Sequence, residues 1–102
     1  MSDITIGVKH PGFPWTLWIV EDRLKTYQNI VSGYIEHFER SESGIEFFCN
    51  ENGKLQGLIP NVFSLRNQDV ICGPIFAVRT DENGEFASLT NEDIADLLTL
   101  FK

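Results

Sequence analysis

The chain of 102 residues has a formal net charge of −7, a hydrophobic fraction of 42% and a charged fraction of 23%. This length and composition are typical of one folded domain, so we expect a single domain over residues 1–102. The negative charge, without any cluster of Lys and Arg, argues against direct binding to nucleic acid or to an anionic membrane. No apolar run approaches the ~20 residues that span a bilayer, and the N-terminus lacks a secretory signal, so the expected location is cytoplasmic.

Two strands joined by a loop are predicted at the start of the chain. Residues 4–8 alternate between apolar and small or polar side chains, which is the period of a half-buried strand. Residues 10–14 contain two prolines and a glycine and form a loop. The second strand, residues 15–20, places Trp15 and Trp18 on opposite faces, and both faces are apolar. We therefore expect this strand to be buried on both sides or to meet another subunit.

A short helix and two strands are expected next. Asp22 is the predicted N-cap of the helix, and Gly33 is the residue that ends it. Residues 34–39 and 45–50 then alternate as strands, with a polar turn between them. The apolar stripe of the helix, which we expect to face the core, consists of Leu24, Tyr27, Ile30 and Val31.

The dipeptide Asn52-Gly53 is the strongest hairpin signal in the chain, because both central positions of a type I′ turn need a positive φ. We expect it to join two strands at the middle of the sheet. Residues 61–68 fit either a helical turn or an irregular packed segment. Residues 70–79 form the longest strand candidate, and Gly73-Pro74 within it predicts a bulge or an edge position.

The last part of the chain predicts a turn, a short extended segment and an amphipathic helix. Asn83-Gly84 supplies the turn, and Thr90 caps the helix with Asp93 as its capping-box partner. The elements together predict an α+β fold with a mostly antiparallel sheet of about five or six strands and two short helices. The apolar stripe of the C-terminal helix consists of Ile94, Leu97, Leu98 and Phe101.

Five short segments of the chain together resemble the pattern of a known family. These segments are Val31–Glu36, Cys49–Leu55, Pro60-Asn61, Gly73-Pro74 and Ser88–Thr90. The family is called domain of unknown function 3846 and consists of small proteins encoded by phages and mobile elements. The resemblance implies an accessory protein that acts in a bacterial cytoplasm. It transfers no catalytic residue, because the family has no agreed activity.

The side chains that could carry metal or nucleophilic chemistry are scattered along the chain. His10, His37, Cys49 and Cys72 lack the spacing of a zinc motif, so we expect no metal site and no cofactor. Cys49 and His37, on consecutive strands, are the one conceivable nucleophile pair. Both cysteines, however, lie in apolar contexts typical of buried reduced thiols. We therefore expect a protein that is not an enzyme.

Polar residues near the Asn52-Gly53 turn form the first candidate site. If the strands pair as expected, these side chains converge at one end of the sheet and bind a small polar ligand. Turn formation and solvation explain the same residues without a ligand. The candidate ligand-binding residues are Tyr34, Asn50, Glu51, Lys54 and Asn61.

An acidic run without a basic residue forms the second candidate site, a surface for a partner protein. Its carboxylates fit an electronegative rim that complements a basic surface, although acids in a turn or in the first turn of a helix also stabilise those structures. An exposed tryptophan would add a hydrophobic anchor and favours a homo-oligomer. The candidate partner-binding residues are Trp15, Trp18, Asp81, Glu82, Glu85, Glu92, Asp93 and Asp96.

Three functions remain compatible with these observations. The first hypothesis is a non-catalytic interaction module, an accessory protein that binds an unidentified host protein in the cytoplasm. The second is a small-molecule binding protein that sequesters a nucleotide-like compound or another polar metabolite. The third is an unrecognised enzyme, which would need a perturbed titratable pair in a cleft.

Overall fold

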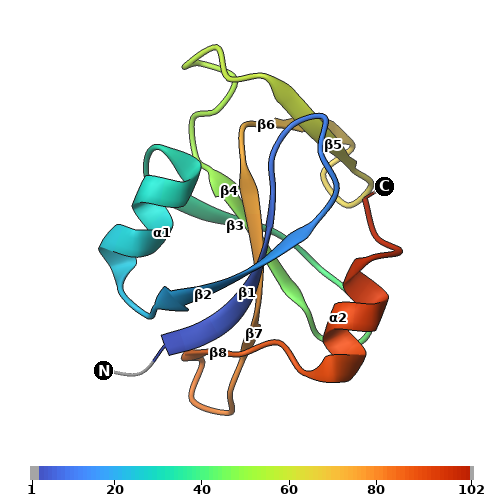
Figure 1. Cartoon of the computed structure of the whole chain (residues 1–102). Coiled ribbons are helices and arrows are strands. Elements are labelled where there is room, and N and C mark those ends of the chain that lie inside the picture. The colour runs from blue at the N-terminus through green and yellow to red at the C-terminus, as the bar shows by residue number, and fades with distance from the viewer. Residues whose placement is uncertain (1–2, 102) are drawn as a thin grey trace.

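A six-stranded sheet forms the centre of the protein in the computed structural model, which describes residues 3–101 (Figure 1). In spatial order it consists of β2 (Thr16–Glu21), β1 (Asp3–Lys9), β7 (Ile75–Thr80), β4 (Glu46–Asn50) and β3 (Ile35–Arg40), with β8 (Phe86–Ala87) paired to the end of β7. Neighbouring strands are antiparallel throughout. The strands β2 and β3 are therefore the two edges of the main path through the sheet.

Both faces of this sheet are covered, so the molecule has three layers. One helix packs on one face, and the second helix and a separate two-stranded hairpin lie on the other (Figure 1). These elements are α1 (Leu24–Val31) on the first face, and α2 (Asn91–Leu97) with β5 (Pro60–Ser64) and β6 (Asp69–Cys72) on the second. Strand β7 serves both cores, because its side chains alternate between the faces. Ile75 and Ala77 belong to the α2 side, Phe76 and Val78 to the α1 side, and none of the four is exposed.

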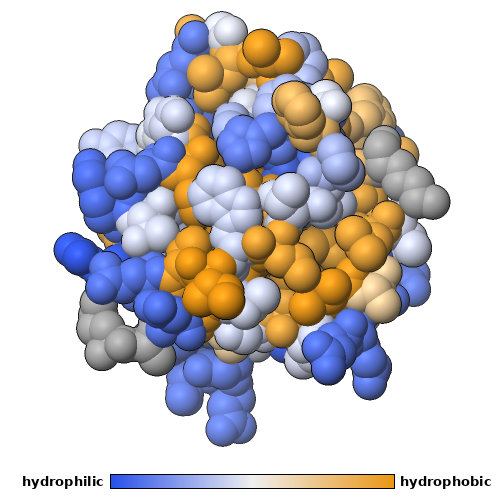
Figure 2. All heavy atoms as spheres, in the orientation of Figure 1, coloured by the Kyte–Doolittle hydropathy of each residue, from blue (hydrophilic) through white to orange (hydrophobic). Residues whose placement is uncertain are grey.

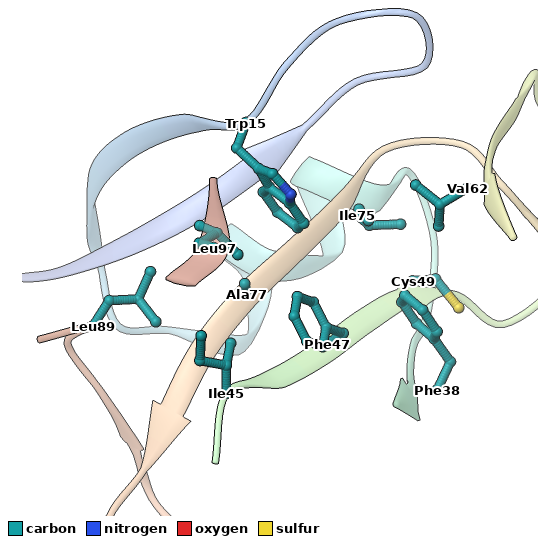
Figure 3. Packing of buried hydrophobic residues seen from close by; sticks show 10 residues of the cluster. All are labelled: Trp15, Phe38, Ile45, Phe47, Cys49, Val62, Ile75, Ala77, Leu89 and Leu97. Carbon is teal, nitrogen blue, oxygen red and sulfur yellow. The ribbon is translucent and has the colours of Figure 1, made fainter. Parts of the chain in front are cut away.

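The core beneath α2 is built around aromatic and aliphatic side chains from distant parts of the chain. Figure 3 shows Trp15, Phe47 and Leu97 in this cluster, next to β7. The ring centroids of Trp15 and Phe47 are 5.8 Å apart. Residue 7 of β1 is glycine, and a Cβ there would lie only 2.5 Å from Leu97 Cδ2. The absence of a side chain on Gly7 thus allows α2 to approach the sheet closely.

The predicted fold class is confirmed: the protein is α+β, with a mostly antiparallel sheet and two short helices. The capping box of α2 is also confirmed, because the Thr90 side chain accepts a hydrogen bond from the Asp93 backbone and the Asp93 side chain accepts one from Thr90. Gly84, with a φ of 80°, forms the predicted turn between β7 and β8. Within residues 3–101, neither helix is long and apolar enough to cross a membrane.

The hairpin predicted at Asn52-Gly53 is wrong. Neither residue has a positive φ, and β4 pairs with β3 and β7 while β5 pairs with β6 in a different sheet. The segment instead winds through successive turns, in which the Gln56 N–H donates to Asn52 O and the Leu58 N–H to Gly53 O. A Cβ on Gly53 would lie 2.5 Å from the carbonyl oxygen of Cys72. This glycine therefore serves close backbone packing rather than a type I′ turn.

The single long strand predicted over residues 70–79 is also wrong. Gly73-Pro74 divides it into β6 and β7, which belong to different sheets. Gly73 has a φ of 91°, a conformation that other residues rarely adopt, and Pro74 has no N–H to donate to a strand ladder. The dipeptide thus redirects the chain from the small hairpin into the centre of the main sheet.

Both helices differ in detail from the sequence prediction. Arg23 occupies the N-cap position of α1 without a side-chain cap, and Asp22 instead accepts a 2.5 Å hydrogen bond from the Tyr27 hydroxyl. Ser32, one residue before Gly33, takes the left-handed conformation that ends this helix. Leu24 and Leu98 are exposed rather than part of the buried stripes. Helix α2 ends at Leu97, and Phe101 reaches the core from the segment beyond it.

Candidate functional site

The five residues of the predicted polar ligand site do not share one hollow. Asn50, Glu51 and Lys54 line a hollow of about 150 Å³, together with residues of β6. Tyr34 lines a different hollow beside α1, and Asn61 lines a third one near Trp15. The shared hollow is smaller than the ~300 Å³ at which small-molecule sites begin.

Asn50 has a structural role in this region. It is 4% exposed, and its Nδ2 donates to the carbonyl oxygens of Val31 and Ser32, at 3.0 and 3.2 Å, and to Gln56. Its Oδ1 accepts a 2.7 Å hydrogen bond from the Asn52 N–H. Asn50 thereby fastens the end of α1 to the loop after β4, and its polar atoms are occupied within the protein.

Lys54, from the same hollow, forms an ion pair with Asp69 on β6. The hydrogen bond from Lys54 is the main reason that the pKa of Asp69 lies below its ordinary value. Both side chains are about half exposed, and ion pairs of this kind contribute little to stability. This pair orients Lys54 towards the small hairpin.

Cys49 and His37 do not form a nucleophile pair. In the β3–β4 ladder Glu36 lies opposite Cys49, whereas His37 lies opposite Phe48 and bonds to Glu46 at 2.7 Å. Burial, and to a smaller extent the charge of Glu36, raises the pKa of the Cys49 thiol to about 12. Cys49 is therefore an unreactive buried thiol, and both cysteines are free, as the apolar contexts predict. Within residues 3–101, no three side chains of His, Cys, Asp or Glu are grouped as metal ligands.

The residues of the predicted partner surface are also separated. Trp15 is 8% exposed and donates its indole N–H to Leu100 O at 2.8 Å, whereas Trp18 is 37% exposed. Asp93 is buried in the first turn of α2 and accepts hydrogen bonds from Arg79. The other five acids are exposed, but in different places: Asp81, Glu82 and Glu85 at the β7–β8 turn, and Glu92 and Asp96 on α2.

A groove of about 630 Å³ lies between the β3–β4 turn, the β5–β6 hairpin and the segment after α2. Its apolar side chains include Phe63 and Leu65, which are 52% and 78% exposed, and Phe101. Its acidic side chains are Glu39, Glu42 and Asp96. The groove therefore combines an apolar wall with three carboxylates.

The electrostatics of this groove are negative. Arg40 is its basic residue, and Arg40 Nε pairs with Glu46 Oε2 at 3.3 Å. Glu39 accepts a 2.8 Å hydrogen bond from the Ser64 hydroxyl, which fixes this carboxylate without neutralising it. Among residues 3–101, no Lys, Arg or His forms an ion pair with Glu39, Glu42 or Asp96.

Sequence reasoning identified one residue of this groove, Asp96, and missed the others. Glu42 lies in a predicted polar turn and Glu39 directly precedes that turn. Acids are expected at such positions in any soluble protein. Phe63 and Leu65 lie in the segment whose conformation the sequence left open. The available signal was the pair of large apolar residues within a polar segment, because such residues mark interfaces when a strand exposes them.

The fold defines a small α+β protein whose six-stranded antiparallel sheet carries α1 on one face and α2 with the β5–β6 hairpin on the other. The chain belongs to the family described as Domain of unknown function (DUF3846), whose family model matches residues 6–102. This match confirms the resemblance carried by the five segments and extends it towards the N-terminus, over all of β2 and most of β1. No curated protein and no solved structure matches the chain.

Proposed function

We propose that this protein is a non-catalytic interaction module of the bacterial cytoplasm, an accessory protein of the phage or mobile-element type that binds a host protein. The groove that contains Phe63, Leu65 and the three carboxylates is the proposed contact surface. The observation that carries the proposal is the exposure of Phe63 and Leu65 beside acids without basic partners. The proposed occupant is a segment of the host protein that carries both basic and apolar side chains.

Complementarity supports this choice of occupant. Burying exposed apolar side chains against a partner favours binding, because it lowers the free energy by roughly 25 cal/mol per Å² of apolar surface removed from water. Carboxylates around them favour a partner of positive charge and speed its association at low ionic strength. The net charge of −7 adds to this attraction over longer distances. A nucleic acid or an anionic membrane would be repelled by the same charges, so neither is a proposed partner.

The test compares groove variants with matched variants elsewhere on the surface. We expect Leu65→Ser to weaken binding to a host protein by roughly tenfold, and Glu42→Lys with Asp96→Lys to weaken it similarly at low salt. The controls are Leu55→Ser, which alters an 88% exposed leucine that does not line the groove, and Glu82→Lys with Glu85→Lys at the β7–β8 turn. The measurement is affinity capture from bacterial lysate at several salt concentrations, with quantitative mass spectrometry.

The outcome that supports the proposal is one protein whose capture is lost in the groove variants, retained in the controls and weakened by salt. Equal capture by the groove variants and the controls would show that the groove is not the contact. A loss in the Glu82→Lys and Glu85→Lys control alone would move the contact to the β7–β8 turn. If the amount of captured partner does not change with salt concentration, the partner does not bind through basic side chains.

We also propose that the protein is a homo-oligomer, and that the edge strand β2 is the contact between its copies. Leu17, Trp18 and Ile19 are 47%, 37% and 76% exposed, so apolar side chains project from both faces of this edge. Figure 2 shows hydrophobic residues gathered over the part of the surface formed by β2 and α2. Such a patch on an unprotected strand edge favours pairing with another strand.

A further inference from the structure

Lys9, at the end of β1, is a buried lysine that has no counter-charge among residues 3–101. Its exposure is 6%, and its ammonium group donates a 2.8 Å hydrogen bond to Asn61 Oδ1. Among residues 3–101, no carboxylate lies within ion-pair distance of it. Burial lowers the pKa of Lys9, because a buried ammonium loses its hydration. A lysine in this state is costly to the fold, so an anion that pairs with it gains affinity.

The side-chain amide of Asn61, which accepts the hydrogen bond from Lys9, is itself held in one orientation. Its Nδ2 donates to the carbonyl oxygens of Lys9, at 2.8 Å, and Gly73, at 2.9 Å. These two bonds fix the orientation of the amide, since the opposite orientation would place Oδ1 against two carbonyl oxygens. Asn61 Oδ1 therefore receives one of the three N–H groups of the Lys9 ammonium, and the other two have no acceptor among the described residues.

Lys9 and Asn61 line a hollow of about 460 Å³, between the loop before β2 and the segment after α2. This volume lies within the ~300–1,000 Å³ range of small-molecule sites. Three aromatic side chains contribute to its wall: Phe13, Trp15 and Phe101. The hydrogen bond from Trp15 Nε1 to Leu100 O connects two segments that line the hollow, the loop before β2 and the segment after α2. The result is an apolar, aromatic cavity with a single buried cation.

We propose that this hollow binds a small aromatic monocarboxylate, with the carboxylate on Lys9 and the ring among Phe13, Trp15 and Phe101. A single positive charge matches a monoanion, whereas a phosphate ester would keep uncompensated charge. The aromatic wall favours a flat ring over a polar body. This site goes beyond the proposed function, because Lys9, Phe13 and Trp15 line this hollow and not the groove. Leu100 and Phe101 line both.

The test titrates 2-naphthoate, a probe of this class, into ¹⁵N-labelled protein and follows the Trp15 indole N–H by NMR. We expect saturable shifts at Trp15. The neutral analogue 2-naphthamide should bind roughly tenfold more weakly or worse, because it cannot form the charged hydrogen bond with Lys9. Lys9→Met, which has a similar length and no charge, should weaken naphthoate binding by a similar factor.

Two further variants keep the test independent of folding defects in Lys9→Met. Phe13→Ala removes one aromatic ring from the wall of the hollow and should weaken binding several-fold; Phe13 is 67% exposed, so the variant should fold. Leu55→Ala, at an exposed position that does not line the hollow, should leave binding unchanged. The proposal is overturned if Trp15 does not shift with 2-naphthoate. Equal affinities for the acid and the amide, or for the wild type and a folded Lys9→Met protein, overturn it as well. Host-protein capture is measured separately, so failure of one proposal does not imply failure of the other.

Discussion

Replacing Asp93 with Ala lowers the free energy of unfolding by about 3 kcal/mol, which is the largest stability change that we expect from a single acidic residue. Asp93 is 2% exposed, and its two carboxylate oxygens accept hydrogen bonds from Arg79, at 2.8 Å to Nε and 2.6 Å to Nη2. The same carboxylate accepts the Thr90 N–H in the capping box of α2. Alanine therefore leaves a partly buried guanidinium without its partner and removes one cap of the helix.

Chemical denaturation and thermal melting measure this loss. For a domain of this length, the midpoint should fall by roughly 10 to 20 °C. Glu92→Ala is the matched control, because Glu92 is exposed in the same helical turn and should change stability by less than about 0.5 kcal/mol. Equal melting of the Asp93→Ala protein and the wild type would contradict the structural role assigned to this carboxylate.

The same ion pair predicts a dependence of stability on pH. The hydrogen bonds from Arg79 lower the pKa of Asp93 to about 2, from an ordinary value of 3.8. Because the folded pKa is the lower one, the stabilising contribution of Asp93 is fully present above pH 3.8 and is lost as the pH falls towards 2. The stability difference between the wild type and Asp93→Ala should therefore shrink over this interval. A difference that stays constant down to pH 2 would contradict the lowered pKa.

Asp93 also shows how far sequence alone can describe an acidic surface. Its spacing from Thr90 correctly predicted the capping box, because that motif depends on residues three positions apart. The same residue was grouped with the exposed acids, because Arg79 lies in a separate strand and nothing local reveals the pairing. Local patterns predicted most strands and the capping box of α2, whereas the pairings across the sheet could be known only from the structure.

The Asn52-Gly53 and Gly73-Pro74 dipeptides illustrate the same limit. Asn-Gly is a strong hairpin signal in isolation, but the buried amide of Asn50 bonds to the end of α1 and draws the chain into a different loop. The polar residues expected to converge there are consequently divided among three hollows. Lys9 escaped notice because a single lysine at the end of an apolar strand is ordinary in sequence. Its unusual feature, burial without a carboxylate, is a property of tertiary packing.

The two edges of the sheet differ in a way that favours β2 as the proposed contact between copies. Strand β3 carries four charged or titratable side chains and a register shift between His37 and Glu39. Charges and bulges of this kind discourage edge-to-edge pairing. Strand β2 has no register shift, and its one charged residue is Glu21 at its end. The unprotected edge is therefore the one that is also apolar.

In the proposed dimer, a two-fold axis passes through Trp18 and relates β2 to its equivalent in the second copy. Antiparallel pairing about that axis places Trp18 opposite its equivalent, Leu17 opposite Ile19, and Thr16 opposite Val20 of the other copy. The exposed apolar side chains then meet one another on each face of a continuous sheet. Glu21 lies beyond these pairs and does not oppose another acid, so this pairing brings no two like charges together.

If the proposed dimer forms, Ile19→Lys should convert it into a monomer and weaken self-association by roughly 100-fold or more, because symmetry places two unpaired ammonium groups in the apolar contact. Ile19 is 76% exposed in the single chain, so the variant should fold normally. Leu24→Lys is the matched control, since Leu24 is 60% exposed on α1 and is not part of β2. Sedimentation equilibrium over a range of concentrations distinguishes the cases. A wild-type protein that stays monomeric, or an Ile19→Lys protein that dimerises as the control does, would exclude β2 as the contact.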